Sequence, residues 1–118
     1  MATFKNTVLS NIDQGFTTAY TSSTDSTIIL SILCANTNGI SAADVSVSQC
    51  SDNNTVESYL AYTVPVPADA NLEILSNKYI LPSGKKIRLN SSASGYLDAT
   101  VSIVEVWRGR LLEGLFHL

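Results

Sequence analysis

Apolar and polar residues alternate along most of this chain, in short runs that turn residues separate. Residues 79–106 show the pattern most clearly, because Ile87 and Leu89 fall on one side of a strand while Lys86 and Arg88 fall on the other. A period of two residues is typical of a strand with one buried and one solvated face. The next strand alternates in the same way, and two such strands in succession predict an antiparallel sheet with one wet face.

Turn residues mark the ends of these runs. A tight turn is expected at residues 81–84, where Gly84 supplies the positive φ that other residues resist. The dipeptide Asn38-Gly39 is a strong hairpin signal. The expected strands lie at residues 3–12, 16–21, 27–35, 44–50, 56–64, 72–75, 79–81, 85–89 and 97–103.

Eight or nine short strands with turn signals at roughly 8–12-residue intervals predict an all-β fold. The expected architecture is a single antiparallel β-sandwich, with either jelly-roll or immunoglobulin-like strand order. The chain has 118 residues, which is the size of one domain. We expect residues 1–107 to form the sandwich and residues 108–118 to form a short non-β tail.

The strand expected at 27–35 is apolar on both faces. One face carries Ile28, Leu30, Ile32 and Cys34, and the other carries Ile29, Leu33 and Ala35. A strand that is apolar on both faces is covered on both. Its outer face therefore meets either another element of this chain or another subunit.

The two cysteines are expected on different sides of their strands. Cys34 shares its face with isoleucines and is placed in the core, whereas Cys50 has the opposite parity to the inward-facing Val45 and Val47. Cys50 is therefore placed outside, on the side of the intervening serines. Regular strands would keep the two thiols apart, so we expect no disulfide.

The last eleven residues end the alternating pattern. Leaving several apolar side chains in water is unfavourable, because burying each is worth about 1.5–3 kcal/mol. The tail is expected to dock on its own sandwich or, as an arm, on a neighbouring subunit; a third interpretation is an appendage from cloning or a shifted frame. The candidate interaction residues are Arg108, Leu111, Leu112, Leu115, Phe116 and Leu118.

The low content of charged residues limits the classes of partner that the chain is expected to bind. Charged residues make up 14% of the chain and the net charge is −3, so there is no basic patch for nucleic acid. No apolar run approaches the roughly 18 residues of a membrane span, and the N-terminus lacks a signal-peptide core. We expect neither nucleic acid nor membrane as a partner, and synthesis in a cytosol.

No pattern of catalytic or metal-binding residues stands out. His117 is the single histidine and lies next to the C-terminus, which is a poor place for a positioned imidazole. The acidic and amide residues near positions 52–54 and 69–71 are interpreted as turn residues rather than calcium ligands. Lys85, Lys86 and Arg88 are interpreted as a solvated strand edge. We expect no enzyme activity, no cofactor and no metal.

Several aromatic residues could stack on a sugar ring, as in carbohydrate-binding β-sandwiches. Tyr59, Tyr79, Tyr96 and Trp107 are the candidates. Their positions are scattered along the chain rather than aligned. Tyr59 is expected on the opposite face of its strand from Tyr62, and Trp107 is expected to close the end of the core.

The opening ATFKNTVLSNID and the later run from Val64 to Val106 resemble small virion structural proteins of tailed bacteriophages, including those that infect cyanobacteria. The resemblance covers about residues 2–106. Two departures are Lys85, where an aspartate commonly follows the turn glycine, and the tail that continues beyond Val106. The shared pattern is carried by Val66, Pro67, Leu72, Glu73, Leu75, Leu81, Gly84, Ile87, Ser91, Leu97, Asp98, Ser102 and Glu105.

This resemblance implies a non-enzymatic component of a virus particle, made in the host cytoplasm and located in the virion. The implied role is a capsid decoration (cement) protein that stabilises the head through subunit contacts, or a tail or baseplate component. The implied partners are the major capsid protein or other virion proteins, together with further copies of the chain. A glycan-binding β-sandwich is the alternative that the aromatic residues leave open.

Overall fold

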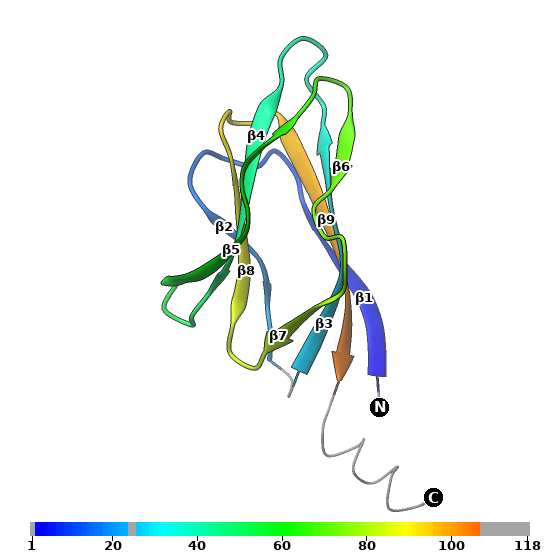
Figure 1. Cartoon of the computed structure of the whole chain (residues 1–118), viewed down its shortest axis with the longest axis vertical. Coiled ribbons are helices and arrows are strands. Elements are labelled where there is room, and N and C mark those ends of the chain that lie inside the picture. Colours follow the sequence, from blue (N-terminus) through cyan, green and yellow to red (C-terminus); the bar gives the residue numbers. More distant parts are fainter. Residues whose placement is uncertain (1, 24–25, 107–118) are drawn as a thin grey trace, which may run out of the picture.

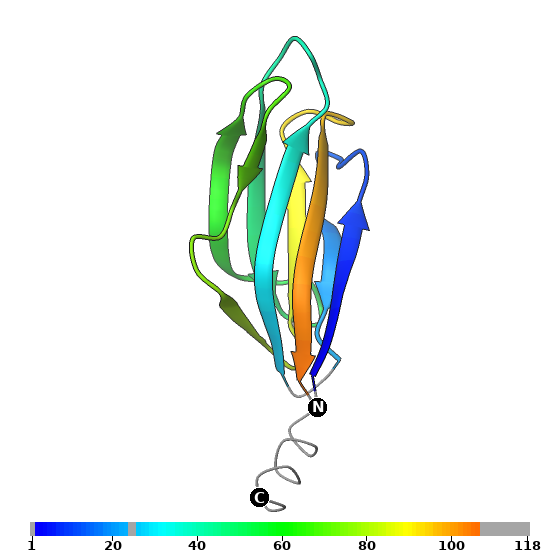
Figure 2. The same ribbon diagram turned by 90° about the vertical axis from the view of Figure 1, so that its right-hand side faces the viewer.

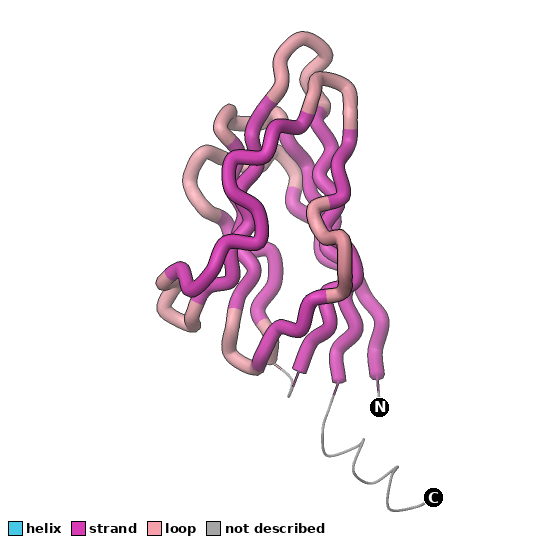
Figure 3. The backbone as a smooth tube through the Cα atoms, in the orientation of Figure 1, coloured by secondary structure: helices cyan, strands magenta, loops and turns pink. Residues whose placement is uncertain are grey.

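The computed structural model describes residues 2–23 and 26–106, which form nine β-strands in two antiparallel sheets packed face to face (Figure 1). Sheet A contains, in spatial order, β1 (Ala2–Leu9), β9 (Leu97–Val106) and β3 (Ser26–Asn36), with β6 (Asn71–Glu73) and β7 (Tyr79–Pro82) both beside β3. Sheet B contains β2 (Thr17–Thr21), β8 (Lys86–Ser91), β4 (Ala43–Cys50) and β5 (Val56–Val66). The described part of the chain contains no helix (Figure 3), and the expected all-β sandwich is confirmed.

The strand pairs are nested one inside the other, which decides the strand order. β1 pairs with β9, β2 with β8, β3 with β6 and β7, and β4 with β5. Because β6 and β7 pair with successive parts of β3, they count as one interrupted strand. Eight strands nested in this way and folded into two sheets have the jelly-roll order rather than the immunoglobulin-like order.

Nesting places most consecutive strands in opposite sheets. Among the described strands, β4 and β5 are the only consecutive pair joined by a hairpin. The expectation that β8 and β9 are neighbours in one sheet is therefore wrong. The hairpin expected at Asn38-Gly39 is also wrong, because the loop there connects β3 of sheet A to β4 of sheet B. The turn at Gly84 has the expected positive φ of 83°, but it too connects the two sheets.

Side chains inside the loop after β3 explain why it turns without a hairpin. The Asn36 amide donates hydrogen bonds to the carbonyl oxygens of Ser41 and Val66, and so fastens the loop to the end of β5. The Asn38 side-chain oxygen accepts hydrogen bonds from two backbone N–H groups, those of Ile40 and Ser41. Asparagine side chains that bind nearby backbone in this way are typical of turns.

The core lies between the sheets and consists of the inward-facing residues of both. Ile87 and Leu89 of β8 are fully buried, as their alternation predicts. The inward-facing row of β9 is at most 2% exposed and confirms the prediction for that strand as well; it contains Leu97, Ala99, Val101 and Ile103. Burying each large apolar side chain contributes about 1.5–3 kcal/mol, so these rows dominate the stability of the sandwich.

A β-bulge interrupts the alternation of β3. The pairing of β3 with β9 shifts register after Ile29, which leaves Leu30 outside the regular ladder. Ile29 and Ile32 are consequently both fully buried, although a regular strand would place them on opposite faces. The expectation that Ile28 and Leu30 share the face of Ile32 and Cys34 is therefore wrong, while Cys34 is buried as expected.

The outward side of β4 is more deeply buried than the sequence suggests. Val45 and Val47 face the core as expected, but Ser46, Ser48 and Cys50 are also buried, with at most 6% of each residue exposed. The expectation that Cys50 lies at the surface is thus wrong. Both cysteines are free thiols, and burial raises the pKa of the Cys34 thiol to about 12.

Candidate interaction surfaces

Four apolar residues on neighbouring strands form a row across the outer face of sheet A. Phe4 of β1 lies opposite Val104 of β9, Val104 opposite Ile28 of β3, and Ile28 opposite Ile80 of β7. Residues directly opposite one another in a sheet lie on the same face. Ile103, which directly precedes Val104 in β9, is fully buried in the core, so the row of Val104 faces away from the core. Figure 2 looks onto sheet A with β1, β9 and β3 side by side.

The two ends of this apolar row are open to solvent. Phe4 is 74% exposed and Ile80 is 66% exposed, whereas Val104 between them is only 8% exposed. The next row along the strands is polar and consists of Asn6, Ser102 and Ser31. A contiguous row of apolar side chains with exposed ends, unlike a single exposed apolar residue, is typical of an interaction site.

The outer face of sheet B is built differently. A row of mostly polar residues crosses it in register, and it consists of Thr18 on β2, Arg88 on β8, Ser48 on β4 and Tyr59 on β5. The Arg88 guanidinium donates hydrogen bonds to the Thr18 hydroxyl at 3.1 Å and to the Phe16 carbonyl oxygen at 2.8 Å. Arg88 is therefore held by the neighbouring strand rather than free in solvent.

Three aromatic rings form a cluster at sheet B; two come from β5 and one from the residue before β2. The ring centroid of Tyr59 is 6.4 Å from that of Phe16 and 4.8 Å from that of Tyr62, with an edge-to-face angle of 70° to Tyr62. Tyr59 is 44% exposed and Tyr62 is 64% exposed. The expectation that Tyr59 and Tyr62 lie on opposite faces is wrong, since register shifts along the β4–β5 pair break the alternation of β5.

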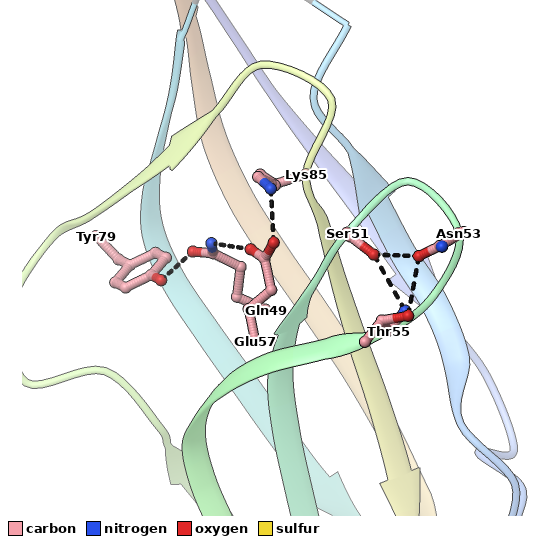
Figure 4. Close-up of polar contacts among 7 residues, drawn as sticks. All are labelled: Gln49, Ser51, Asn53, Thr55, Glu57, Tyr79 and Lys85. Atoms are coloured by element: carbon pink, nitrogen blue, oxygen red, sulfur yellow. Dashed lines mark hydrogen bonds and ion pairs between the residues drawn. The ribbon is translucent and has the colours of Figure 1, made fainter.

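The remaining aromatic candidates lie elsewhere. Tyr79 is on β7 of sheet A, and its hydroxyl donates to the Gln49 side chain across the sandwich edge (Figure 4). Tyr96 lies before β9, where its carbonyl oxygen accepts hydrogen bonds from Thr37. The expected lack of a single aligned set of these aromatic residues is confirmed for Tyr59, Tyr79 and Tyr96, and Trp107 lies outside the described residues.

The basic residues of β8 do not form a sheet edge. β8 lies between β2 and β4, so the interpretation of this strand as a solvated edge is wrong. Lys85 pairs with Glu57 at 2.6 Å, and Glu57 also accepts a hydrogen bond from Gln49 at 2.9 Å (Figure 4). The hydrogen bond from Lys85, assisted by Gln49, lowers the pKa of Glu57 from its ordinary value.

The turn between β4 and β5 uses its polar side chains internally. The Asn53 side-chain oxygen accepts hydrogen bonds from the hydroxyls of Ser51 and Thr55, and the Ser51 hydroxyl accepts one from the Thr55 backbone N–H (Figure 4). This confirms the interpretation of these residues as turn residues. Within residues 2–23 and 26–106, no group of three or more His, Cys, Asp and Glu side chains could hold a metal ion.

A buried polar network connects the two sheets at the end where β1 begins and β9 ends. Tyr20 of sheet B donates a 2.5 Å hydrogen bond to Glu105 of sheet A, and Glu105 forms an ion pair with Lys5 at 3.1 Å. Burial raises the pKa of Glu105, but the hydrogen bonds from Tyr20 and Lys5 and the charge of Lys5 outweigh it and lower the pKa. Burial and the Glu105 hydrogen bond raise the pKa of Tyr20 to about 12. Because Tyr20 belongs to sheet B and Glu105 and Lys5 belong to sheet A, these contacts fasten the two sheets together.

The interaction residues expected from the sequence cannot be placed on either face. Arg108, Leu111, Leu112, Leu115, Phe116 and Leu118 lie outside the described residues, and so does His117. The apolar row was missed because its members come from four strands, and only the strand order brings Phe4 and Ile80 onto one face. Residues 2–23 and 26–106 contain no helix that is long and apolar enough to cross a membrane.

Comparison with known proteins supports the fold. The chain matches no protein-family model and no curated protein. A search of solved structures finds a chain from the crystal structure of the T13 IBDV viral particle, with a TM-score of 0.52 and 8% sequence identity. The likeness covers 87% of this chain and 30% of that one, so this protein spans less than a third of the length of its structural neighbour. At this identity the likeness is one of fold.

Proposed function

We propose that this protein is a non-enzymatic structural component of a virus particle, and specifically a decoration (cement) protein on the head of a tailed bacteriophage. The observation that carries the proposal is the apolar row of sheet A, with Phe4 and Ile80 mostly exposed at its ends. Such a row suits burial against a neighbouring subunit better than it suits solvent. The jelly-roll order and the likeness to a viral-particle chain support the same role.

The chemistry of the described surface fits an adhesive role. Only 14% of the residues are charged, which keeps the desolvation cost of a contact low. The clustered ionisable side chains, around Glu57 and Glu105, are each neutralised by a lysine within the chain. A decoration protein stabilises a shell because it binds the assembled state and not the dissociated subunits.

Residues 108–118 are proposed as a second contact element, an arm that reaches a neighbouring subunit. The major capsid protein is the partner that this role requires, with further copies of the chain around it. A tail or baseplate component would use the same contacts at another position in the particle. In either case the protein resides in the virion after synthesis in the host cytoplasm.

The test uses particles purified from the source of this sequence. An antibody against the purified chain should label the particles in immunogold electron microscopy, over heads if the protein is a decoration protein and over tails if it is a tail component. Adding the pure protein to undecorated heads should raise the temperature at which they rupture. Unlabelled particles, together with heads that bind no added protein, would refute the proposal.

The aromatic cluster of sheet B supports a second candidate, a glycan-binding module. Tyr62 is 64% exposed and could stack on a pyranose ring, while the edge-to-face neighbour Tyr59 would fix its orientation. The T-shaped arrangement offers one stacking face rather than a flat platform. Glycan-array binding that Tyr62→Ala abolishes would support this function, and an array without any signal would exclude it for the sugars tested.

A further inference from the structure

We propose that the apolar row of sheet A receives residues 111–118 from a second copy of this chain. This inference rests on the proposed function, because it names the surface through which neighbouring copies join. The receiving surface consists of Phe4, Val104, Ile28 and Ile80. In the part of the chain that the structure describes, nothing covers its two ends, which are 74% and 66% exposed.

The sequence of the segment matches this surface in pattern. Placed on a helix at about 100° per residue, its five apolar residues fall on one side, and Glu113, Gly114 and His117 fall on the other. Alternation suited to a strand is absent. The apolar residues are Leu111, Leu112, Leu115, Phe116 and Leu118.

The dimensions also match. Eight residues of helix are about 12 Å long at about 1.5 Å per residue. The apolar row crosses four neighbouring strands, a width of about 14 Å at about 4.8 Å per strand spacing. A helix of the length of 111–118 laid along the row would therefore cover most of the distance from Phe4 to Ile80. A segment this short is marginal alone, so it would gain its structure from docking.

The direction of β9 argues that the segment comes from another copy. Val106, the last described residue, lies on the same face as Val104 and leads away from the row. Val106 lies on β9, an inner strand of the row, so residues 107–110 of the same chain would have to run sideways to an edge strand before residues 111–118 could span the row from one end to the other.

A second copy is free of this constraint. Its segment can approach the row from the side of the sheet and lie across the strands. If each of two copies gives one segment and receives one, the contact is isologous and closes as a two-fold dimer. A segment of the same chain normally binds more readily, because its tether keeps it at a high local concentration. This advantage is lost where the tether does not let the segment lie along the row.

Disulfide trapping with mixed single-cysteine variants tests the proposal directly. Full-length Ile80→Cys and full-length Leu115→Cys are purified separately, mixed and mildly oxidised. The native thiols Cys34 and Cys50 are fully buried and should remain unreactive. We expect a disulfide-linked heterodimer on a non-reducing gel. The matched control is Ile40→Cys. Ile40 is 92% exposed and lies in the loop after the end of β3, whereas Ile80 pairs near the start of β3. The loop between β3 and β4 and the strand β7 are at opposite ends of the sandwich (Figure 1), so this variant should give no heterodimer with Leu115→Cys.

The double variant Ile80→Cys/Leu115→Cys in one chain separates the two origins of the segment. Linked dimers support the proposal. A disulfide confined to the monomer shows docking on the chain's own sheet and overturns it, as does the absence of any Ile80–Leu115 link. Light scattering gives a second readout: the mass of the full chain should fall at least twofold when the chain is ended at Trp107, and an unchanged mass would count against the proposal.

The contact between copies and the proposed decoration role can fail independently of each other. If mixed variants form no heterodimer but the protein still binds undecorated heads, the segment proposal fails and the structural role stands. If the heterodimer forms and no particle component is bound, the contact between copies stands and the decoration role fails.

Discussion

The outer faces of the two sheets are both built from antiparallel strands, but they differ in how exposed their side chains are. Each is crossed by a row of four residues in register: Phe4, Val104, Ile28 and Ile80 on sheet A, and Thr18, Arg88, Ser48 and Tyr59 on sheet B. On sheet A the ends of the row are exposed and apolar. On sheet B the row is tied by hydrogen bonds from Arg88, and Ser48 is fully buried.

This difference shows that the burial of a side chain on an outer face depends on the size of the side chains on the adjacent strands. Serine is small and polar, yet Ser48 has no exposed surface, because large side chains on both adjacent strands, Arg88 and Tyr59, stand beside it. Phenylalanine is large and apolar, yet Phe4 stays exposed at the edge strand β1. Sheet B covers the middle of its row with its own side chains, whereas the row of sheet A ends in two largely exposed apolar side chains.

The same substitution on both faces should give the largest contrast. Ser48→Leu adds volume where no space is exposed, so it should lower the free energy of unfolding by about 2 kcal/mol, within the range for overpacking. Ser102→Leu, on the outer face of sheet A, should change it by less than about 0.5 kcal/mol. Urea unfolding of both variants measures the difference. Equal losses would show that the two faces are equally closed.

Removing one aromatic ring should open the face of sheet B. Tyr59→Ala loses contacts with both neighbouring rings and should cost about 1–2 kcal/mol of stability. It should also let a thiol reagent reach Cys50, which lies beside Ser48 with its sulfur 3.3 Å from the Ser48 hydroxyl. Cys34 lies in the core between the sheets and serves as the internal control. Peptide mapping after labelling distinguishes the two thiols, and unchanged labelling of Cys50 would contradict the expectation that the Tyr59 ring helps to keep reagents from it.

Much of the core could be predicted from the sequence, because alternation reports directly which side chain is buried. It correctly assigned Ile87, Leu89 and the inward residues of β9. It failed at Ile29 and along β5, since a bulge shifts the alternation by one residue and leaves no local signal. The parity argument also failed for Cys50, because parity gives the face of a residue and not what covers that face.

The pairing of strands and the candidate surfaces could not be predicted in this way. Jelly-roll nesting joins the first strand to the last, so its contacts are the least local in the chain. The hairpin signal of Asn38-Gly39 is a local preference, and the Asn36 contacts to a distant strand end override it. The apolar row exists only after β1, β9, β3 and β7 are aligned, and the aromatic cluster only after β5 is bulged.

Polar substitutions at the ends of the apolar row should separate interaction from stability. Phe4→Ser and Ile80→Ser remove side chains that are already mostly solvated, so each should change the free energy of unfolding by less than about 0.5 kcal/mol. Both should weaken self-association at least tenfold if the row is an interface, since truncating a buried anchor commonly costs more than about 1.4 kcal/mol of binding. Analytical ultracentrifugation measures the dissociation constant. The matched control is Tyr62→Ser, because Tyr62 is similarly exposed on sheet B. Equal weakening of self-association by all three variants would show that the row of sheet A is not the interface.

The smallest effect is expected from the ion pair at the surface of sheet B. Because the folded state lowers the pKa of Glu57, its contribution to stability is present above the ordinary glutamate pKa of about 4.3 and is lost as the pH falls through the folded value. Glu57→Gln should therefore flatten the stability curve slightly below about pH 4.3, and added salt should reduce the difference by screening an exposed pair. Glu105→Gln should flatten it further, because Glu105 is buried between Tyr20 and Lys5. Thermal melts between about pH 3 and pH 7 measure both variants, and a larger effect at Glu57 than at Glu105 would mean that the outer face of sheet B, rather than the fastening between the sheets, controls the acid stability of the fold.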